Sequence, residues 1–240
     1  MRYLILIAFF FIAGMSYLSQ TGYFGDSQIQ DITSISWSIA TPAWRTFSIR
    51  GLIYVWLIIA IFYQVSSHQE HIRKIRPYLF VNFVCHGLWY AFSTIDGYIW
   101  VSAILIILMW LSLLPIHSLL SKRKYEKWEN ICLAIPISIY TSWLTIATPL
   151  NIAWAISDLW GTRAVTSVWW VLLWISISYG TTIRITQHTK RISFLVVTIW
   201  ALAGVMVARE FDAPIIFWTA GGLMLLTLII IAYNRKSLRW

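Results

Sequence analysis

Long apolar runs separated by short polar stretches fill the chain from one end to the other. A transmembrane helix needs about 20 mostly apolar residues, because each residue adds about 1.5 Å across a hydrocarbon layer of about 30 Å. Eight runs meet this need, and no linker divides them into soluble domains. They are predicted at Tyr3–Ser19, Phe47–Ser66, Pro77–Thr94, Tyr98–Leu120, Asn130–Ser157, Ala164–Ile183, Ile192–Ala208 and Pro214–Asn234. The pattern predicts an all-α fold, a polytopic transmembrane helical bundle.

The first run has an alternative interpretation as a cleaved signal peptide, because it follows Arg2. A signal peptide ends in a small-x-small cleavage site. No convincing site of that kind stands near Ser16–Thr21, so a membrane helix is the favoured interpretation.

Basic residues collect in every second connection between the runs. With a cytoplasmic N-terminus, the inside segments hold 14 of the 18 Lys and Arg residues, whereas six of the nine acidic residues fall outside. These inside segments are the N-terminus, His68–Arg76, Ser121–Glu129, Arg184–Arg191 and Arg235–Trp240. Cytoplasmic loops carry such an excess of Lys and Arg. The asymmetry predicts eight spans with both termini in the cytoplasm, in the cell (plasma) membrane.

Composition agrees with a lipid environment. Hydrophobic residues make up 59% of the chain and charged residues only 11%, whereas a soluble domain carries about 25% charged residues. The net charge of +9 does not indicate nucleic acid, because the basic residues lie in short clusters between apolar runs. The two cysteines, Cys85 and Cys132, lie in apolar runs and are expected to be free, buried thiols. The bilayer is therefore the expected partner.

The longest connection, Gln20–Thr46, is rich in aromatic residues. Long loops of compact proteins are usually either functional or disordered. The aromatic residues favour a loop that folds back and covers something.

Polar side chains within a span normally face the interior of the bundle, because lipid offers them no hydrogen bond. In the second run, Phe47, Arg50 and Tyr54 share a face. Arg50 either snorkels to the interface or contacts an anion at the outer mouth of a cavity.

The third run places Asn82, His86 and Trp89 on one face. His86 is expected near the middle of the membrane. It is either a neutral histidine hydrogen-bonded to a neighbouring helix or a contact to a ligand, metal or haem.

The fifth run has an aromatic face with a small residue and an amide in it, which predicts a notch with one hydrogen-bonding group. The face consists of Tyr140, Trp143, Ala147, Asn151 and Trp154. A second side carries Ser138, Thr141, Thr145 and Thr148, which favour helix–helix contacts. Pro149 predicts a kink. In the seventh run, Gly204 and Ala208 have small-xxx-small spacing, which predicts close helix packing.

Three stretches resemble the translocator-protein family, also called tryptophan-rich sensory proteins (TspO/MBR). Trp143, Ala147, Thr148 and Asn151 stand at the spacing of that family's last-helix signature, Trp-x-x-x-Ala-Thr-x-x-Asn, with Pro136 and Tyr140 before them. Thr41–Tyr54 resembles the family's Pro-rich loop running into its second helix, and His86–Trp89 resembles the Asn-x-x-Trp of its third. The resemblance covers about Met1–Ser157, and the last three runs resemble the extension of a longer branch.

The resemblance implies a five-helix core over residues 1–157 and a three-helix extension over residues 158–240. It also implies a ligand pocket lidded by the first loop. Family members bind tetrapyrroles such as porphyrin and haem, and some bind sterols. Carried over by position, the ligand-binding residues are Trp44, Phe47, Arg50, Tyr54, His86, Trp89, Tyr140, Trp143, Ala147 and Asn151. No cofactor is required, porphyrin or haem being expected as ligand, and a homodimer is left open.

Two of these positions depart from the family's pattern. Arg50 stands where the family usually has Trp, and His86 stands where it usually has Asn. The departures indicate either a ligand different from the family's usual one or a more acidic one. Porphyrin propionates facing Arg50 would fit, since Arg pairs bidentately with carboxylates.

A membrane protein that binds a flat apolar ligand, in a binding or sensory role, is the favoured function. A transporter of such a ligand is the alternative, although no repeat and no intramembrane acid support it. An enzyme is not expected, because the spans hold no paired acids, no nucleophile with its base and no metal cluster.

Overall fold

The structure is a computed structural model that describes residues 1–25, 42–95, 97–121, 126–161, 167–210 and 212–239. Within these ranges the chain forms eight long helices and no strand, so the predicted all-α bundle is confirmed. The long helices are α1 (Arg2–Gln20), α3 (Ile49–Ser66), α4 (Glu70–Phe92), α5 (Ile99–Ser121), α7 (Ile135–Trp160), α8 (Val168–Thr189), α9 (Ile192–Arg209) and α10 (Pro214–Asn234). Three short elements lead into them: the 3₁₀ helix η1 (Trp44–Ser48) before α3, and α6 (Lys127–Glu129) with the π-helical η2 (Asn130–Ala134) before α7.

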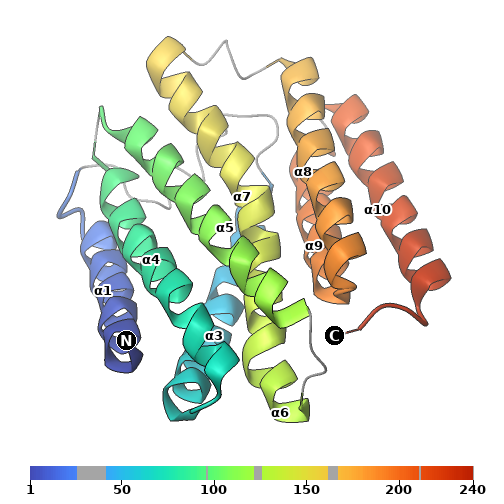
Figure 1. The fold of residues 1–240 in the computed structure, drawn as a ribbon. Helices are drawn as coiled ribbons and strands as arrows, with labels where there is room; N and C mark the ends of the chain where they lie inside the picture. The colour runs from blue at the N-terminus through green and yellow to red at the C-terminus, as the bar shows by residue number, and fades with distance from the viewer. Residues whose placement is uncertain (26–41, 96, 122–125, 162–166, 211, 240) are drawn as a thin grey trace.

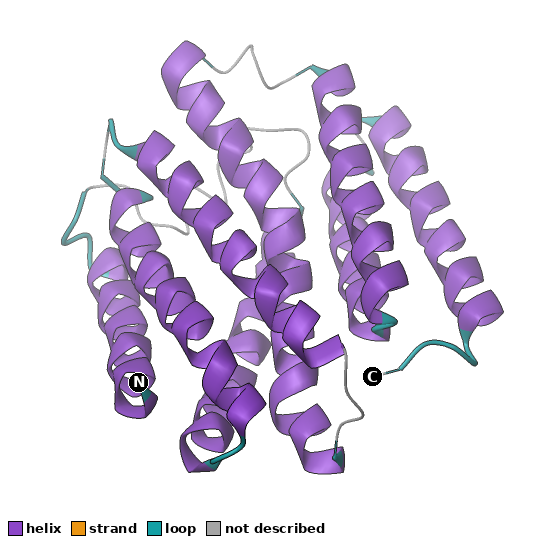
Figure 2. Ribbon diagram, viewed as in Figure 1, coloured by secondary structure: helices purple, strands orange, loops and turns teal. Residues whose placement is uncertain are grey.

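Successive long helices run in opposite directions, and both ends of the chain lie at the same end of the bundle (Figure 1). Figure 2 shows that short connections join the helices at both ends. The predicted fold of the loop Gln20–Thr46 over the bundle falls largely on residues 26–41, which lie outside the described residues.

Seven of the long helices are long and apolar enough to cross a membrane, which makes this an integral membrane protein. The exception is α4, which nevertheless packs along α1 and α5. Its first two turns carry basic residues, and its middle holds Asn82 and His86. The helix with the least apolar sequence is thus the one enclosed between two others, and its span stays a prediction.

The bundle exposes large apolar side chains and buries polar ones within its apolar core. Large side chains such as Phe10, Phe62 and Trp218 are exposed, whereas Gln64 and Thr141 are fully buried. A soluble monomer rarely exposes so much contiguous apolar surface. In a bilayer the arrangement is favourable, because lipid solvates the outer side chains and the polar ones find partners within the protein.

Two groups of buried apolar side chains hold the helices together. The larger group joins α1 to α7 and includes Met109, Leu113 and Ile116. The smaller group joins α8, α9 and α10 and includes Val171 and Ile216. The boundary proposed between a core and an extension stays a prediction. Both cysteines are free thiols, as expected, but only Cys85 is buried, and Cys132 is partly exposed.

Buried and backbone hydrogen bonds fasten the end of the bundle where the chain termini lie. Arg76 donates from Nε to the side-chain oxygen of Gln64 at 2.9 Å, and from Nη2 to the carbonyl oxygens of Gln64 at 2.7 Å and Ser67 at 2.8 Å. At the turn from α8 to α9, the amide of Arg239 donates to the carbonyl of Lys190 at 2.8 Å, and the amide of Ile192 donates to the carbonyl of Arg239 at 2.9 Å. The C-terminal segment is therefore clasped to this turn.

We expect Arg76→Ala to lower the free energy of unfolding by about 2–3 kcal/mol, because it leaves buried oxygen acceptors at the end of α3 without a donor. Lys74→Ala is the matched control. Lys74 is exposed and pairs only with Glu70, at 2.8 Å, where its ammonium group holds the pKa of that carboxyl below its usual value. Its loss is expected to cost less than about 0.5 kcal/mol. Thermal unfolding in detergent measures both, and equal shifts would contradict the expectation.

Candidate ligand-binding site

Arg50, at the start of α3, turns its side chain into the bundle against α4. Its Nη2 donates to the hydroxyl of Tyr90 at 2.6 Å. The guanidinium carbon lies 5.5 Å from the ring centroid of Trp89 and 5.4 Å from that of Tyr90. These are cation–π distances, so the inward position, not snorkelling toward the interface, describes Arg50.

A chain of hydrogen bonds continues from Tyr90 through the centre of the bundle. The hydroxyl groups of Tyr90 and Tyr54 are hydrogen-bonded to each other. The Tyr54 hydroxyl lies 3.2 Å from His86 Nε2, and His86 Nδ1 lies 3.0 Å from the Tyr140 hydroxyl. Tyr140 then donates to Asn82 Oδ1 at 3.0 Å. The chain joins α3, α4 and α7.

The far end of this chain is anchored on α5. Asn82 Nδ2 donates to the carbonyl of Met109 at 2.8 Å and to the hydroxyl of Ser112 at 3.1 Å. An amide nitrogen only donates and an amide oxygen only accepts. The bonds to α5 therefore fix the orientation of the Asn82 amide, with its oxygen turned to the donor from α7.

Both ends of the chain fix the direction of its protons. Arg50 has no acceptor, so it donates to Tyr90. At the other end, the single hydroxyl proton of Tyr140 is donated to Asn82. The Tyr140 oxygen therefore accepts a hydrogen bond from His86 Nδ1. With the Nδ1 proton placed, the Nε2 of a neutral His86 accepts from Tyr54, and Tyr54 in turn accepts from Tyr90. Every hydroxyl proton then has an acceptor when His86 is neutral.

The His86 ring is also held between two aromatic rings. Its centroid lies 5.4 Å from that of Tyr90 with 9° between the planes, and 5.9 Å from that of Tyr140 with 17°. Because both ring nitrogens are engaged by phenols, neither is free to bind a metal in this arrangement. The structure favours the interpretation of His86 as a neutral residue bonded to neighbouring helices.

The structure thus brings five of the ten predicted site residues into one cluster: Arg50, Tyr54, His86, Trp89 and Tyr140. Phe47 and Trp143 form an edge-to-face pair with centroids 5.6 Å apart, and Ala147 packs on the larger apolar group.

Two predicted residues lie elsewhere. Asn151 accepts from Ser102 of α5 at 3.2 Å. Trp44 is 67% exposed, with the guanidinium of Arg45 5.3 Å from its ring centroid. No contact of the described residues links either one to Arg50 or His86. Their part in ligand binding stays a prediction.

Tyr90 is the central residue that sequence reasoning missed. It follows His86 by four positions, and residues four apart share a helix face. Trp89, three positions after His86, occupies the same face, and it was the residue predicted to bind the ligand. Tyr90 is fully buried and contacts both Arg50 and Tyr54.

The predicted hydroxyl side of α7 connects helices in part. Ser138 donates to the carbonyl of Ala134 four residues before it, and the Thr148 hydroxyl has no partner among the described residues. Thr141 lies 2.8 Å from His117 Nε2, and Thr145 accepts from the indole nitrogen of Trp110 at 2.9 Å, both partners being on α5. Ser142 donates to the carbonyl of Phe194 on α9 at 3.1 Å. These bonds are the interhelical contacts that small polar residues supply in membranes.

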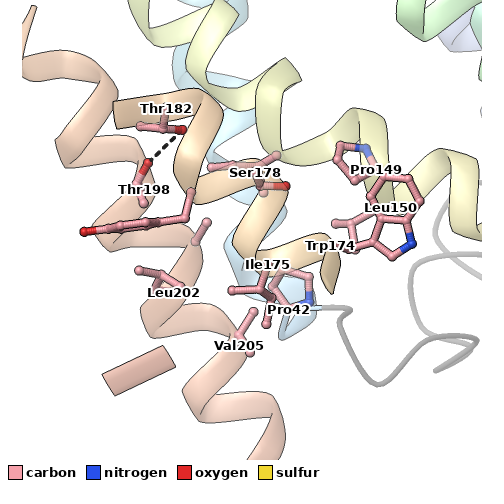
Figure 3. A pocket seen from close by; sticks show the side chains of 13 residues that line it. Pro42, Pro149, Leu150, Trp174, Ile175, Ser178, Thr182, Thr198, Leu202 and Val205 are labelled. Atoms are coloured by element: carbon pink, nitrogen blue, oxygen red, sulfur yellow. Dashed lines mark hydrogen bonds between the residues drawn. The ribbon is translucent and has the colours of Figure 1, made fainter. Parts of the chain in front are cut away.

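A cavity of about 50 Å³ lies on another side of α7, where it meets α8, α9 and the start of η1. Its lining is almost entirely apolar. Figure 3 shows Pro149 and Leu150 on one side of it, Leu202 and Val205 on another, and Pro42 between them. None of the predicted site residues lines this cavity.

We expect Tyr140→Phe to lower the free energy of unfolding by about 1–3 kcal/mol, because it removes the donor to Asn82 and the acceptor for His86 within the bundle. Tyr98→Phe is the matched control, since Tyr98 is 50% exposed and outside the chain. Thermal unfolding of both variants in detergent is the measurement. A Tyr140→Phe variant as stable as the parent would show that these bonds contribute nothing.

Comparison with known proteins identifies the family of the chain. The family model of TSPO-like proteins matches residues 2–233. Neither the search of curated proteins nor that of solved structures found a match. The family match extends through the last three helices as well as the first five. The chain therefore belongs to the family of TSPO-like proteins.

Proposed function

We propose that the protein binds a flat, largely apolar small molecule that carries carboxylate groups, next to Arg50 where α3, α4 and α7 meet. Porphyrin and haem are the candidate ligands. Family membership supports a binding or sensory role in the membrane. The observation that carries the proposal is the unmatched hydrogen-bonding capacity around Arg50.

Arg50 has five N–H donors, and among the described residues only the hydroxyls of Tyr90 and Tyr54 take them up. No carboxylate of the described residues forms an ion pair with it. The indole N–H of Trp89 is buried beside it and has no acceptor among the described residues. An uncompensated charge within a membrane is costly and usually functional, and a ligand carboxylate would satisfy both donors.

Aromatic rings flank this donor cluster. Trp89 and Tyr90 lie under the guanidinium, and Phe47, three residues before Arg50, pairs edge-to-face with Trp143 of α7. Flat apolar ligands bind between aromatic faces and are oriented by a few polar groups. A tetrapyrrole with propionate groups combines the two requirements, its rings stacking on the aromatic side chains and its carboxylates reaching Arg50.

We infer that the residues of the cluster bind a ligand and do not catalyse a reaction. Both nitrogens of His86 are held by phenols, which leaves the ring no lone pair for a reacting group. We place the protein in the plasma membrane with both termini in the cytoplasm. Both termini lie at one end of the bundle, together with the start of α4, with α6 and with the turn from α8 to α9 (Figure 1). These elements hold the basic Arg73, Lys127 and Lys190.

Transport of the ligand is the second candidate. The cavity beside Pro149 favours transport. A cavity between α7, α8 and α9, next to a proline inside α7, gives these helices room to move. Binding alone needs no such movement.

A titration with protoporphyrin IX and its dimethyl ester tests the proposal. We expect Arg50→Met to weaken binding of the free acid by about tenfold or more, since a hydrogen bond to a charged group contributes about 1.5–3 kcal/mol. Binding of the ester should change less than about twofold, because the ester carries no charge to pair. Quenching of tryptophan fluorescence measures both affinities. Arg45→Met, which removes an exposed charge five positions away, is the control. Equal effects of Arg50→Met on acid and ester would contradict the pairing.

Proteoliposomes loaded with the protein separate binding from transport. On our proposal, uptake of protoporphyrin IX stops at the amount bound by the protein and does not change with time. Accumulation that rises beyond the molar amount of protein, and that needs a sealed membrane, would instead show transport. Liposomes carrying Arg50→Met protein correct for partition of the porphyrin into lipid.

A further inference from the structure

The short helix η1 is fastened to α9, a helix of the C-terminal part of the chain. The amide of Ala43 donates to the carbonyl of Gly204 at 2.9 Å. The indole nitrogen of Trp200 donates to the carbonyl of Thr46 at 2.9 Å. Two hydrogen bonds thus join η1 and the residue before it to one face of α9, across more than 150 positions of sequence.

Gly204 makes this approach sterically feasible. A Cβ atom at that position would overlap the hydroxyl and the methyl group of Thr46. Thr46 is buried, at 4% exposure, and a β-branched side chain has few alternative rotamers. The small-residue spacing of α9 does mark a close approach, and at Gly204 the neighbour is η1.

The element held in this way carries part of the candidate site. Phe47, which packs on Trp143, is the fourth residue of η1, and Arg50 follows three residues later. A 3₁₀ helix of five residues has little stability of its own, and η1 has no side-chain cap. Its position relative to α7 therefore depends on contacts with other helices, and α9 supplies them.

We propose that Gly204 and Trp200 are positioning residues for the ligand site: α9 sets the position of η1, and through η1 the positions of Phe47 and Arg50. This inference rests on the proposed function. The C-terminal helices then belong to the binding machinery, and ligand affinity depends on how α9 holds η1.

The test measures protoporphyrin IX binding to the full-length protein by tryptophan fluorescence quenching. Gly204→Ala is expected to weaken binding about tenfold by displacing Thr46. Gly222→Ala on α10 is the matched control, since a Cβ there meets no atom within 4 Å, and it should leave affinity unchanged. Thr46→Ala combined with Gly204→Ala should recover most of the affinity, because it removes the two atoms that overlap most.

Trp200→Phe provides a second variant in case Gly204→Ala fails to fold. It keeps the apolar bulk and removes the donor to Thr46, and we expect binding to weaken several-fold. For either variant, the thermal midpoint is measured in parallel. Weakened binding in a protein that unfolds at the parent's temperature supports positioning, whereas affinity that falls only along with stability indicates a structural role and overturns it.

The outcomes also separate this inference from the proposed function. If the parent binds protoporphyrin IX in an Arg50-dependent manner and both α9 variants bind it equally well, the positioning role is wrong and the site stands. If the parent shows no Arg50-dependent binding, the proposed function itself fails. Recovery of affinity in the double variant identifies the contact between Thr46 and Gly204 as the cause.

Discussion

Lipid offers no hydrogen bond to a side chain in the hydrocarbon layer, and this constraint determines which helix faces meet in this protein. Arg50 enters the bundle as a donor that cannot accept, and Asn82 is fixed by α5 with its oxygen turned inward. Between these two ends, three phenols and one imidazole form a chain of hydrogen bonds in which each group donates to the next acceptor. Three helices supply them, α3, α4 and α7, and α5 holds the far end of the chain through Asn82.

A closed network of this kind gives specificity more than net stability, because each group loses its hydration and regains it from a neighbour. Arg50 is the member whose requirements the described residues leave unmet. Aromatic faces reduce the cost of its charge without neutralising it. The electrostatics of the site are therefore incomplete, and a carboxylate beside Arg50 would complete them.

Helical periodicity accounts for most of what the sequence could predict. Eight apolar runs became eight helices, and residues three or four apart on α3 and α4 did converge. The prediction that residues share a face was less accurate for residues far apart on one helix. Asn151 lies eight residues beyond Trp143, a rotation of about 80° away from it at 100° per residue, and it meets α5 instead. Contacts such as Gly204 with Thr46 depend on which helices are neighbours, and no local pattern contains that information.

The clasp between Arg239 and the turn at Lys190 closes the chain of α9 and α10 into a ring held by two backbone hydrogen bonds. Two such bonds alone would not offset the entropy of closing so long a loop, so they persist only while the two helices stay packed. The amide protons of Ile192 and Arg239 are therefore a probe of how α9 and α10 pack together. Their exchange with deuterium reports whether the last two helices are docked.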